Sequence, residues 1–334
     1  MTVNKKSLQW DQYWSLGNIT SLSDAFDGNY EGAIASFWKN RLRFLSNNTR
    51  ILDICTGNGA VALFAAQIAL ECDFHFEIHG IDMADIHPEH ILEAHPEMAA
   101  QLQEIRFHPR TAVEKQPFNN NSFDLIVGQF ALEYCDVDRA IPELARLLDE
   151  NGSMVFIIHH KESEILKVAR SELDQAHILF DELDLFSRAR SLVMALDSQS
   201  VKAKRANTKN RYLEKEQKKL NDALMTIKQK ADKYADARFM LRAANHVVTL
   251  FRDNMALSRT QKFDYLQQCE NHFRGNKERL LDLYRAGFDD AKCIHLRKVC
   301  DQAGLHGTDC VQFHNESGKL LGWKMSVHAT RGPH

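Results

Sequence analysis

Residues 50–64 read RILDICTGNGAVALF, and this stretch decides the fold. Residues 51–54 are apolar apart from one acid, a pattern typical of a buried strand. The small residues of 56–59 predict a tight turn, and the uncharged run 60–69 consists mostly of good helix formers. A strand, a glycine turn and a helix in this order predict a nucleotide-binding unit, because glycine lets the backbone approach a ligand closely.

Two acids and a further strand extend this pattern. Residues 77–81 predict a second strand, and Asp82 follows it at the distance expected of an acid that hydrogen-bonds ribose hydroxyls. Asp53 lies inside the first strand, four residues before Gly57. The apolar run 123–127 predicts another strand, which a polar asparagine-rich turn precedes. The glycine pattern alone fits a dinucleotide site as well as any other nucleoside site. The two acids and the further strand are therefore needed to identify the cofactor.

Together, these residues resemble the class I S-adenosylmethionine-dependent methyltransferases, with a core of the methyltransferase 11/25 type. The first motif of that family is an acid followed by glycines at alternate positions. Asp53, Gly57 and Gly59 match it, while Cys55 replaces the first glycine. The resemblance covers roughly residues 50–160 and the chain end. It implies an α/β fold with a Rossmann-like, seven-stranded, mostly parallel sheet and a closing antiparallel hairpin, and it implies S-adenosyl-L-methionine as the cofactor.

The resemblance also implies where the cofactor binds, since ligands of open α/β sheets lie outside the carboxyl ends of the strands. Tyr13 and Tyr30 would face the sulfonium, because an aromatic face stabilises a cation. Backbone N–H groups would contact the adenine at Ala112, where the family often has an acid. The expected cofactor contacts are Tyr13, Tyr30, Asp53, Thr56, Gly57, Asn58, Gly59, Asp82, Met83, Ala112, Val113, Gln129 and Phe130.

Four polar residues at strand ends are the candidates for acting on the methyl acceptor. Glu133 and Tyr134 follow the strand that starts at Phe123, and His159 and His160 follow an expected strand at 154–158. Histidine is the side chain best suited to proton transfer near neutral pH. We expect these residues to orient the acceptor or take its proton, and we expect no metal, since their spacing does not demand one.

The rest of the chain predicts four segments: an N-terminal helical lid at 1–48, the cofactor-binding core at 49–160, a helical insertion at 161–285 and the remainder of the core sheet at 286–334. The insertion contains one glycine and no proline. A helical seam predicts that its helices pack on one another, and it consists of Leu220, Leu224, Ile227, Ala231 and Tyr234. Outside it, we expect a helix over 89–103 and strands at 105–108, 311–314 and 321–327.

Composition restricts the class of protein. The 334 residues carry a net charge of −3, and the seven cysteines form no CxxC pair, so neither a disulfide framework nor a zinc ribbon is indicated. The first ten residues, MTVNKKSLQW, lack the apolar core of a signal peptide. No apolar run approaches the roughly 18 residues that a membrane span needs. These features predict a cytoplasmic protein without a membrane partner.

We therefore expect a methyltransferase that acts on an oxygen or nitrogen of a small molecule beneath a helical cap. One alternative is a tRNA or rRNA methyltransferase that uses a basic run, namely Lys202, Lys204, Arg205, Lys209, Arg211, Lys215, Lys218 and Lys219. Another is a non-catalytic protein that senses S-adenosylmethionine or serves in assembly. Its helical insertion would then join two copies of the chain in a homodimer. A third is a nicotinamide-dependent oxidoreductase, for which the closing hairpin is unexpected.

Overall fold

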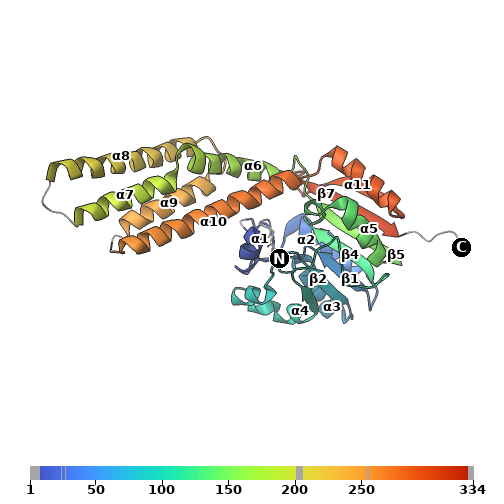
Figure 1. The fold of residues 1–334 in the computed structure, drawn as a ribbon. Helices are drawn as coiled ribbons and strands as arrows, with labels where there is room; N and C mark the ends of the chain where they lie inside the picture. The colour runs from blue at the N-terminus through green and yellow to red at the C-terminus, as the bar shows by residue number, and fades with distance from the viewer. Residues whose placement is uncertain (1–7, 24, 27, 201–205, 254–255, 330–334) are drawn as a thin grey trace. The chain divides into compact units, whose positions relative to one another are not determined.

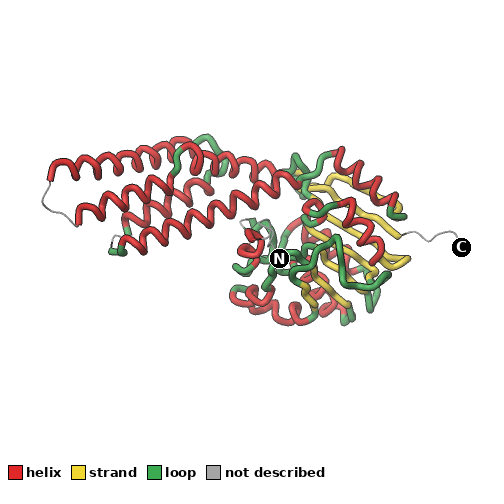
Figure 2. The backbone as a smooth tube through the Cα atoms, in the orientation of Figure 1, coloured by secondary structure: helices red, strands yellow, loops and turns green. Residues whose placement is uncertain are grey.

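The computed structural model describes residues 8–23, 25–26, 28–200, 206–253 and 256–329. The chain folds as two units, one made of Met1–Leu166 with Leu283–His334 and the other of Lys167–Asp282. The first unit contains the sheet and the glycine turn, and the second is helical (Figures 1 and 2). Within the described residues, no helix has both the length and the apolar character needed to cross a membrane.

The described part of the first unit is built on a seven-stranded sheet with the order β3-β2-β1-β4-β5-β7-β6. The strands are β1 (Arg50–Ile54), β2 (Glu77–Ile81), β3 (Ile105–His108), β4 (Phe123–Gln129), β5 (Leu148–Ile158), β6 (Leu305–His314) and β7 (Leu320–Ala329). Strands β1 to β5 pair in parallel, whereas β7 pairs antiparallel with both β5 and β6. This arrangement confirms the expected Rossmann-like sheet with its antiparallel closing hairpin.

Helices cover both faces of the sheet. They are α2 (Gly32–Arg43), α3 (Ala60–Cys72), α4 (Ala99–Gln103), α5 (Val137–Leu147) and α11 (Asp290–Gln302), while α1 (Leu8–Trp14) packs on the loop after β2. Successive residues of a strand point to opposite faces. Ile51 accordingly packs with α2 and α3, while Leu52 and Ile54 pack with α5 and α11 (Figure 1). The two apolar layers hold the strand ends, and hence the glycine turn, in fixed positions.

The expected helix over 89–103 is wrong. This segment instead forms two 3₁₀ turns, η1 (Pro88–Glu93) and η2 (Pro96–Met98), before the short helix α4. Proline disfavours helical backbone in the residue that precedes it. His87 and His95 both stand before a proline and have ψ values of 68° and 65°, outside the helical range. Two prolines eight residues apart therefore divide what periodicity alone presents as one helix. Strands β5 and β6 also begin six residues earlier than expected, at Leu148 and Leu305.

The second unit consists of helices packed around their own apolar core. Its elements are α6 (Glu164–His177), the π-helical turn η4 (Ile178–Glu182), α7 (Leu185–Ser200), α8 (Ala206–Ala231), α9 (Arg238–Arg252) and α10 (Arg259–Ala286). The first residues of α6 and the last residues of α10 belong to the first unit. Leu220 and Ile227 of the expected seam are buried in this core, and the other three seam residues pack against it. The unit's role as a cap stays a prediction.

Candidate functional site

The turn after β1 has an unusual backbone. Cys55, Gly57 and Gly59 all have positive φ values, of 46°, 54° and 97°. Glycine adopts this left-handed region freely, but a residue with a Cβ does so at a cost of roughly 1–2 kcal/mol. Thr56 donates its N–H to the carbonyl of Ile81 at 3.0 Å, which ties the turn to the end of β2. The turn thus lies at the carboxyl edge of two neighbouring strands.

Asp53 joins the end of β1 to the start of α3. Its Oδ2 accepts hydrogen bonds from the Thr56 hydroxyl at 2.6 Å and from the Ala62 N–H at 3.1 Å. The carboxyl group is buried, and this loss of hydration raises its pKa to about 7. The protonation state of Asp53 near neutral pH therefore depends on the charge of any ligand bound beside it.

Asp82 holds the glycine turn from the next strand. Its Oδ2 accepts from the Gly57 N–H and its Oδ1 from the Ala84 N–H, each at 2.8 Å. Burial raises the pKa of this carboxyl to about 6. Two acids with raised pKa values at one sheet edge are typical of a functional site. Burying a carboxyl group costs free energy, so such groups are concentrated where a ligand or a reaction requires them.

A cavity of about 400 Å³ opens beside these two acids, within the first unit. Ten of the seventeen predicted site residues line it: Tyr30, Asp53, Thr56, Asp82, Met83, Ala112, Val113, Gln129, Phe130 and Tyr134. Tyr30 immediately precedes α2, and the other nine come from the ends of β1, β2 and β4 and from the loops that follow β1, β2, β3 and β4. The structure thus brings together residues that are up to 104 positions apart, from Tyr30 to Tyr134, at one edge of the sheet.

Two of the predicted glycine contacts are covered by aromatic side chains instead. A Cβ built on Gly57 would lie 2.5 Å from the indole of Trp14, and one on Gly59 would lie 2.8 Å from the ring of Phe107. Between them, Asn58 donates through Nδ2 to the carbonyls of Trp14 and Asn18, both at 2.9 Å. In this structure the N-terminal segment therefore packs directly on the turn.

Tyr13 does not line the cavity, although Tyr30 does. The Tyr13 hydroxyl donates to the Thr20 carbonyl at 2.7 Å and accepts from the Ser23 N–H at 3.1 Å, so it braces the loop after α1. Tyr30 packs edge-on against Phe130, with ring centroids 6.2 Å apart. Of the two tyrosines predicted to face the sulfonium, only Tyr30 is positioned at the cavity.

Among the four predicted acceptor residues, only Tyr134 lines the cavity. Glu133 lies behind the cavity wall, where it accepts the His159 N–H at 2.6 Å, and burial raises its pKa to about 8. The His159 ring stacks on Phe130 with centroids 3.8 Å apart, and burial lowers its pKa to about 3, so it is neutral. His160 stacks on Trp323 and accepts the Glu162 N–H. The role of these three residues as groups that touch the acceptor gains no support from their positions.

Sequence reasoning missed twelve lining residues, five of them from the N-terminal segment. The additional residues are Trp10, Trp14, Ile19, Thr20, Ser21, Cys55, Ala60, Val61, Ala84, Thr111, Glu114 and Cys135. The aromatic spacing of Trp10 and Trp14 was visible in the sequence, but it could not show which surface they cover. Trp10 stacks on Trp14 and meets Tyr134 edge-on at 5.9 Å, so α1 forms one wall of the cavity.

Comparisons with known proteins agree on the core. Residues 51–152 match the family model described as a methyltransferase domain. The uncharacterised methyltransferase YcgJ of Bacillus subtilis strain 168 is 31% identical over 114 residues, which are 33% of this chain and 41% of the relative. This chain therefore covers less than half the length of that relative.

Two solved structures are also similar. A Methanococcus maripaludis protein proposed to be an S-adenosyl-L-methionine-dependent methyltransferase is 14% identical, with a TM-score of 0.45 over 100% of this chain and 99% of the other. The geranyl diphosphate C-methyltransferase of Streptomyces coelicolor A3(2) is 14% identical, with a TM-score of 0.35 over 47% of this chain and 66% of the other. Both scores are low, and neither likeness bears on what this chain acts on. The family match and the curated relative support a class I S-adenosylmethionine-dependent methyltransferase domain over residues 51–152, with S-adenosyl-L-methionine as its cofactor.

Proposed function

We propose that this chain transfers the methyl group of S-adenosylmethionine to an oxygen or nitrogen of a small molecule. The observation that supports this proposal most directly is the cavity, which combines two buried acids on one side with aromatic residues on the other. Its volume of about 400 Å³ lies near the lower end of the range for small-molecule pockets, so it suits a compact ligand.

The residues of the cavity fit the cofactor. S-adenosylmethionine supplies a methyl group on a cationic sulfur and also carries an ammonium group. Asp53 and Asp82 are carboxyls whose burial makes them costly to ionise, and a neighbouring cation offsets that cost. We propose that Asp82 binds the ribose hydroxyls and that Asp53 faces the amino-acid end, while Ala112 and Val113 flank the adenine.

Gln129 is proposed to help hold the bound cofactor or acceptor. Its Oε1 accepts the Trp38 indole N–H at 2.6 Å, which fixes the orientation of the amide. Its Nε2 is buried and has no acceptor among the described residues. A buried donor without a partner costs roughly 1–3 kcal/mol, and an oxygen of a bound molecule would remove that cost.

Tyr134 is proposed to orient the acceptor, with Trp10 and Phe130 excluding water around it. It is the one predicted acceptor residue on the cavity wall, and its side chain is 36% exposed. Good alignment of acceptor and methyl can supply roughly 7–11 kcal/mol of the barrier reduction. Glu133 and His159 would act only indirectly, by supporting Phe130 from behind.

The test is to incubate the full chain with S-adenosylmethionine and fractionated small metabolites, and to measure S-adenosylhomocysteine by mass spectrometry. We expect turnover with a small-molecule fraction, lower turnover in Tyr134→Phe, and unchanged turnover in Tyr212→Phe, an exposed tyrosine of α8. Binding of S-adenosylmethionine without turnover in any fraction would favour the sensing alternative. Turnover with RNA alone would favour the nucleic-acid alternative.

Two further predictions concern partners. In the basic run, Arg211, Lys215 and Lys218 are exposed on α8, whereas Lys202, Lys204 and Arg205 lie outside the described residues, as does the side chain of Lys209. The RNA methyltransferase alternative requires steeply salt-dependent binding of RNA.

The homodimer predicted through the helical unit is tested by light scattering of the full chain at several concentrations.

A further inference from the structure

A short motif occurs twice in the loop between β2 and α4, and it has no part in the proposed methyl transfer. Residues 87–90 read His-Pro-Glu-His and residues 95–98 read His-Pro-Glu-Met. In both copies the histidine precedes a 3₁₀ turn that begins at the proline. The first copy alone places a second histidine three residues after the first.

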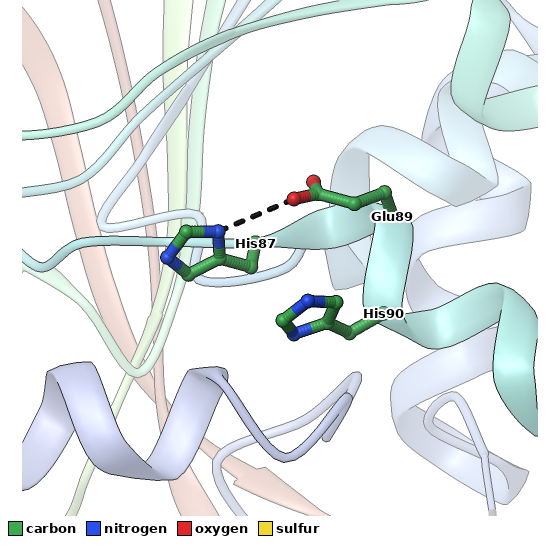
Figure 3. A group of neighbouring side chains, drawn as sticks. All are labelled: His87, Glu89 and His90. Atoms are coloured by element: carbon green, nitrogen blue, oxygen red, sulfur yellow. Dashed lines mark hydrogen bonds and ion pairs between the residues drawn. The ribbon is translucent and has the colours of Figure 1, made fainter.

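The 3₁₀ geometry brings the two histidines of the first copy together. Such a helix has three residues per turn, so side chains at positions i and i+3 lie one above the other. The imidazoles of His87 and His90 accordingly stack with centroids 5.2 Å apart and planes inclined by 17°. Glu89 reaches back toward the same side, and its Oε1 lies 3.2 Å from Nδ1 of His87 (Figure 3).

One ligand atom from each of these residues lies within 4.8 Å of the other two. Tetrahedral zinc, with bonds of roughly 2.0–2.2 Å to nitrogen and oxygen, needs ligand atoms about 3.4 Å apart. The His87–Glu89 pair is already at that spacing, so only His90 has to approach. His87 and Glu89 have side chains that are 39% and 63% exposed, which leaves room for rotation and for entry of an ion.

The remaining nitrogen of each imidazole faces an oxygen. Nδ1 of His90 lies 2.9 Å from the carbonyl of Ser15, which can only accept, so Nδ1 carries the proton and Nε2 keeps its lone pair. Nε2 of His87 lies 4.0 Å from the Asp85 carboxylate, which is too long for a hydrogen bond, while its Nδ1 faces Glu89. Histidine ligands of metals donate their second N–H to carboxylates or carbonyls, as His90 does to Ser15, which fixes the ring orientation.

We propose that His87, Glu89 and His90 bind a borderline divalent transition metal ion, with Zn²⁺ as the reference ion. Two imidazoles and one carboxylate are ligands that suit Zn²⁺, Ni²⁺ or Cu²⁺, whereas Mg²⁺ and Ca²⁺ prefer sites made of oxygen alone. Water completes the coordination, because the site is open to solvent. The hydrogen bond between His90 and the Ser15 carbonyl already links η1 to the residues after α1, so this link would orient His90 toward the ion.

The second copy of the motif provides a matched control. His95 and Glu97 form the same pair, with Nδ1 3.4 Å from Oε1, but Met98 stands where the first copy has His90. Loss of His95 therefore removes a histidine of the same local geometry without touching the proposed site. Glu97→Gln serves in the same way as the control for Glu89→Gln.

The test is calorimetric titration of the full chain with Zn²⁺, repeated with His90→Ala, Glu89→Gln and the two controls, with circular dichroism to verify folding. We expect one equivalent to bind, with an affinity that falls more than about tenfold in His90→Ala and is unchanged in His95→Ala.

A Co²⁺ titration separates this site from the cysteines, since thiolate ligands add a charge-transfer absorption that imidazole and carboxylate ligands lack. We expect d–d absorption without that charge-transfer band, and its loss in His90→Ala. The proposal is overturned if no equivalent binds, if the bound ion has thiolate ligands, or if His90→Ala and His95→Ala bind Zn²⁺ equally well.

Discussion

The indole of Trp14 lies directly over Gly57, in the place that a side chain at that position would occupy. A Cβ on Gly57 would be 2.5 Å from the Trp14 ring, and the φ of Gly57 is 54°. Two independent requirements, a left-handed backbone and a close neighbour, thus demand glycine at this position. The N-terminal segment and the glycine turn are therefore packed against each other, although Trp14 and Gly57 are 43 positions apart in the sequence.

Gly57→Ala should destabilise the chain and weaken binding of S-adenosylhomocysteine. Gly318 is a matched control, because its φ is 77° but no atom lies within 4 Å of its Cβ position. Gly318→Ala therefore has only the backbone cost, and the excess in Gly57→Ala measures the contact with Trp14. In the double variant with Trp14→Ala we expect a coupling of about 0.5–3 kcal/mol in urea unfolding. Additive effects would show that Trp14 does not occupy this place in solution.

Asp82→Asn should weaken binding of S-adenosylhomocysteine by about 1–3 kcal/mol, measured by calorimetry. The carboxylate accepts two backbone N–H groups, and an amide can replace only one of these acceptors, so the turn loses support together with the charge. Asp138→Asn, on the exposed outer side of α5, is the control that should leave affinity unchanged. Equal affinity in wild type and Asp82→Asn would remove Asp82 from the cofactor site.

Affinity for S-adenosylmethionine should rise with pH between about 5.5 and 7.5. The pKa values of Asp82 and Asp53 are raised to about 6 and about 7, so the empty site holds protons that a cationic ligand must displace. Raising the pH removes these protons in advance, and above this window the ligand's own ammonium begins to lose its charge. Calorimetry in two buffers of different ionisation enthalpy counts the released protons. An affinity that falls over this range would contradict the assignment.

Cys55→Gly should be more stable than Cys55→Ala by about 1 kcal/mol in urea unfolding. Both variants lose the sulfur that lies 3.8 Å from the Cys135 sulfur, so their difference reports the φ of 46°, reduced by the greater freedom of glycine in the unfolded chain. The comparison tests whether Cys55, which stands where the family has glycine, strains the backbone of the turn. An alanine variant as stable as the glycine variant would mean that the turn relaxes.

Glu133→Gln should stabilise the chain at pH 8.5 and have little effect at pH 5. The folded pKa of Glu133 is about 8 and the ordinary value is about 4.3, so between these values the folded chain binds one more proton than the unfolded chain. Stability from this group therefore falls as pH rises through that window, and glutamine removes the fall while its oxygen still accepts the His159 N–H. Urea midpoints at the two pH values measure the effect.

Glu143→Gln provides a control of opposite sign for this experiment. Arg146 holds the pKa of Glu143 below its usual range, so its contribution is present at neutral pH and is lost as pH falls through the lowered value. Removing it should destabilise the chain at pH 8.5. If Glu133→Gln destabilised the chain at pH 8.5 as well, this would contradict a raised pKa of Glu133 in the folded protein.

The sequence by itself determined the glycine turn, the order of the core strands and the two acids at their ends. These features are local, because a run of apolar residues and a glycine express their preferences within a few positions. It was misleading over 89–103, where periodicity predicted one helix and Pro96 prevented it. The residue before a proline is restricted away from helical backbone, and this local effect outweighs the periodicity.

Only the tertiary structure decided which side chains reach the cavity. Strand ends define an edge of the sheet, but the direction of each side chain depends on partners that are remote in sequence. His159 follows β5 as expected, yet it stacks behind Phe130, whereas Trp14 crosses from the N-terminal segment to cover Gly57. Such contacts follow from how whole elements pack, so no short stretch of sequence encodes them.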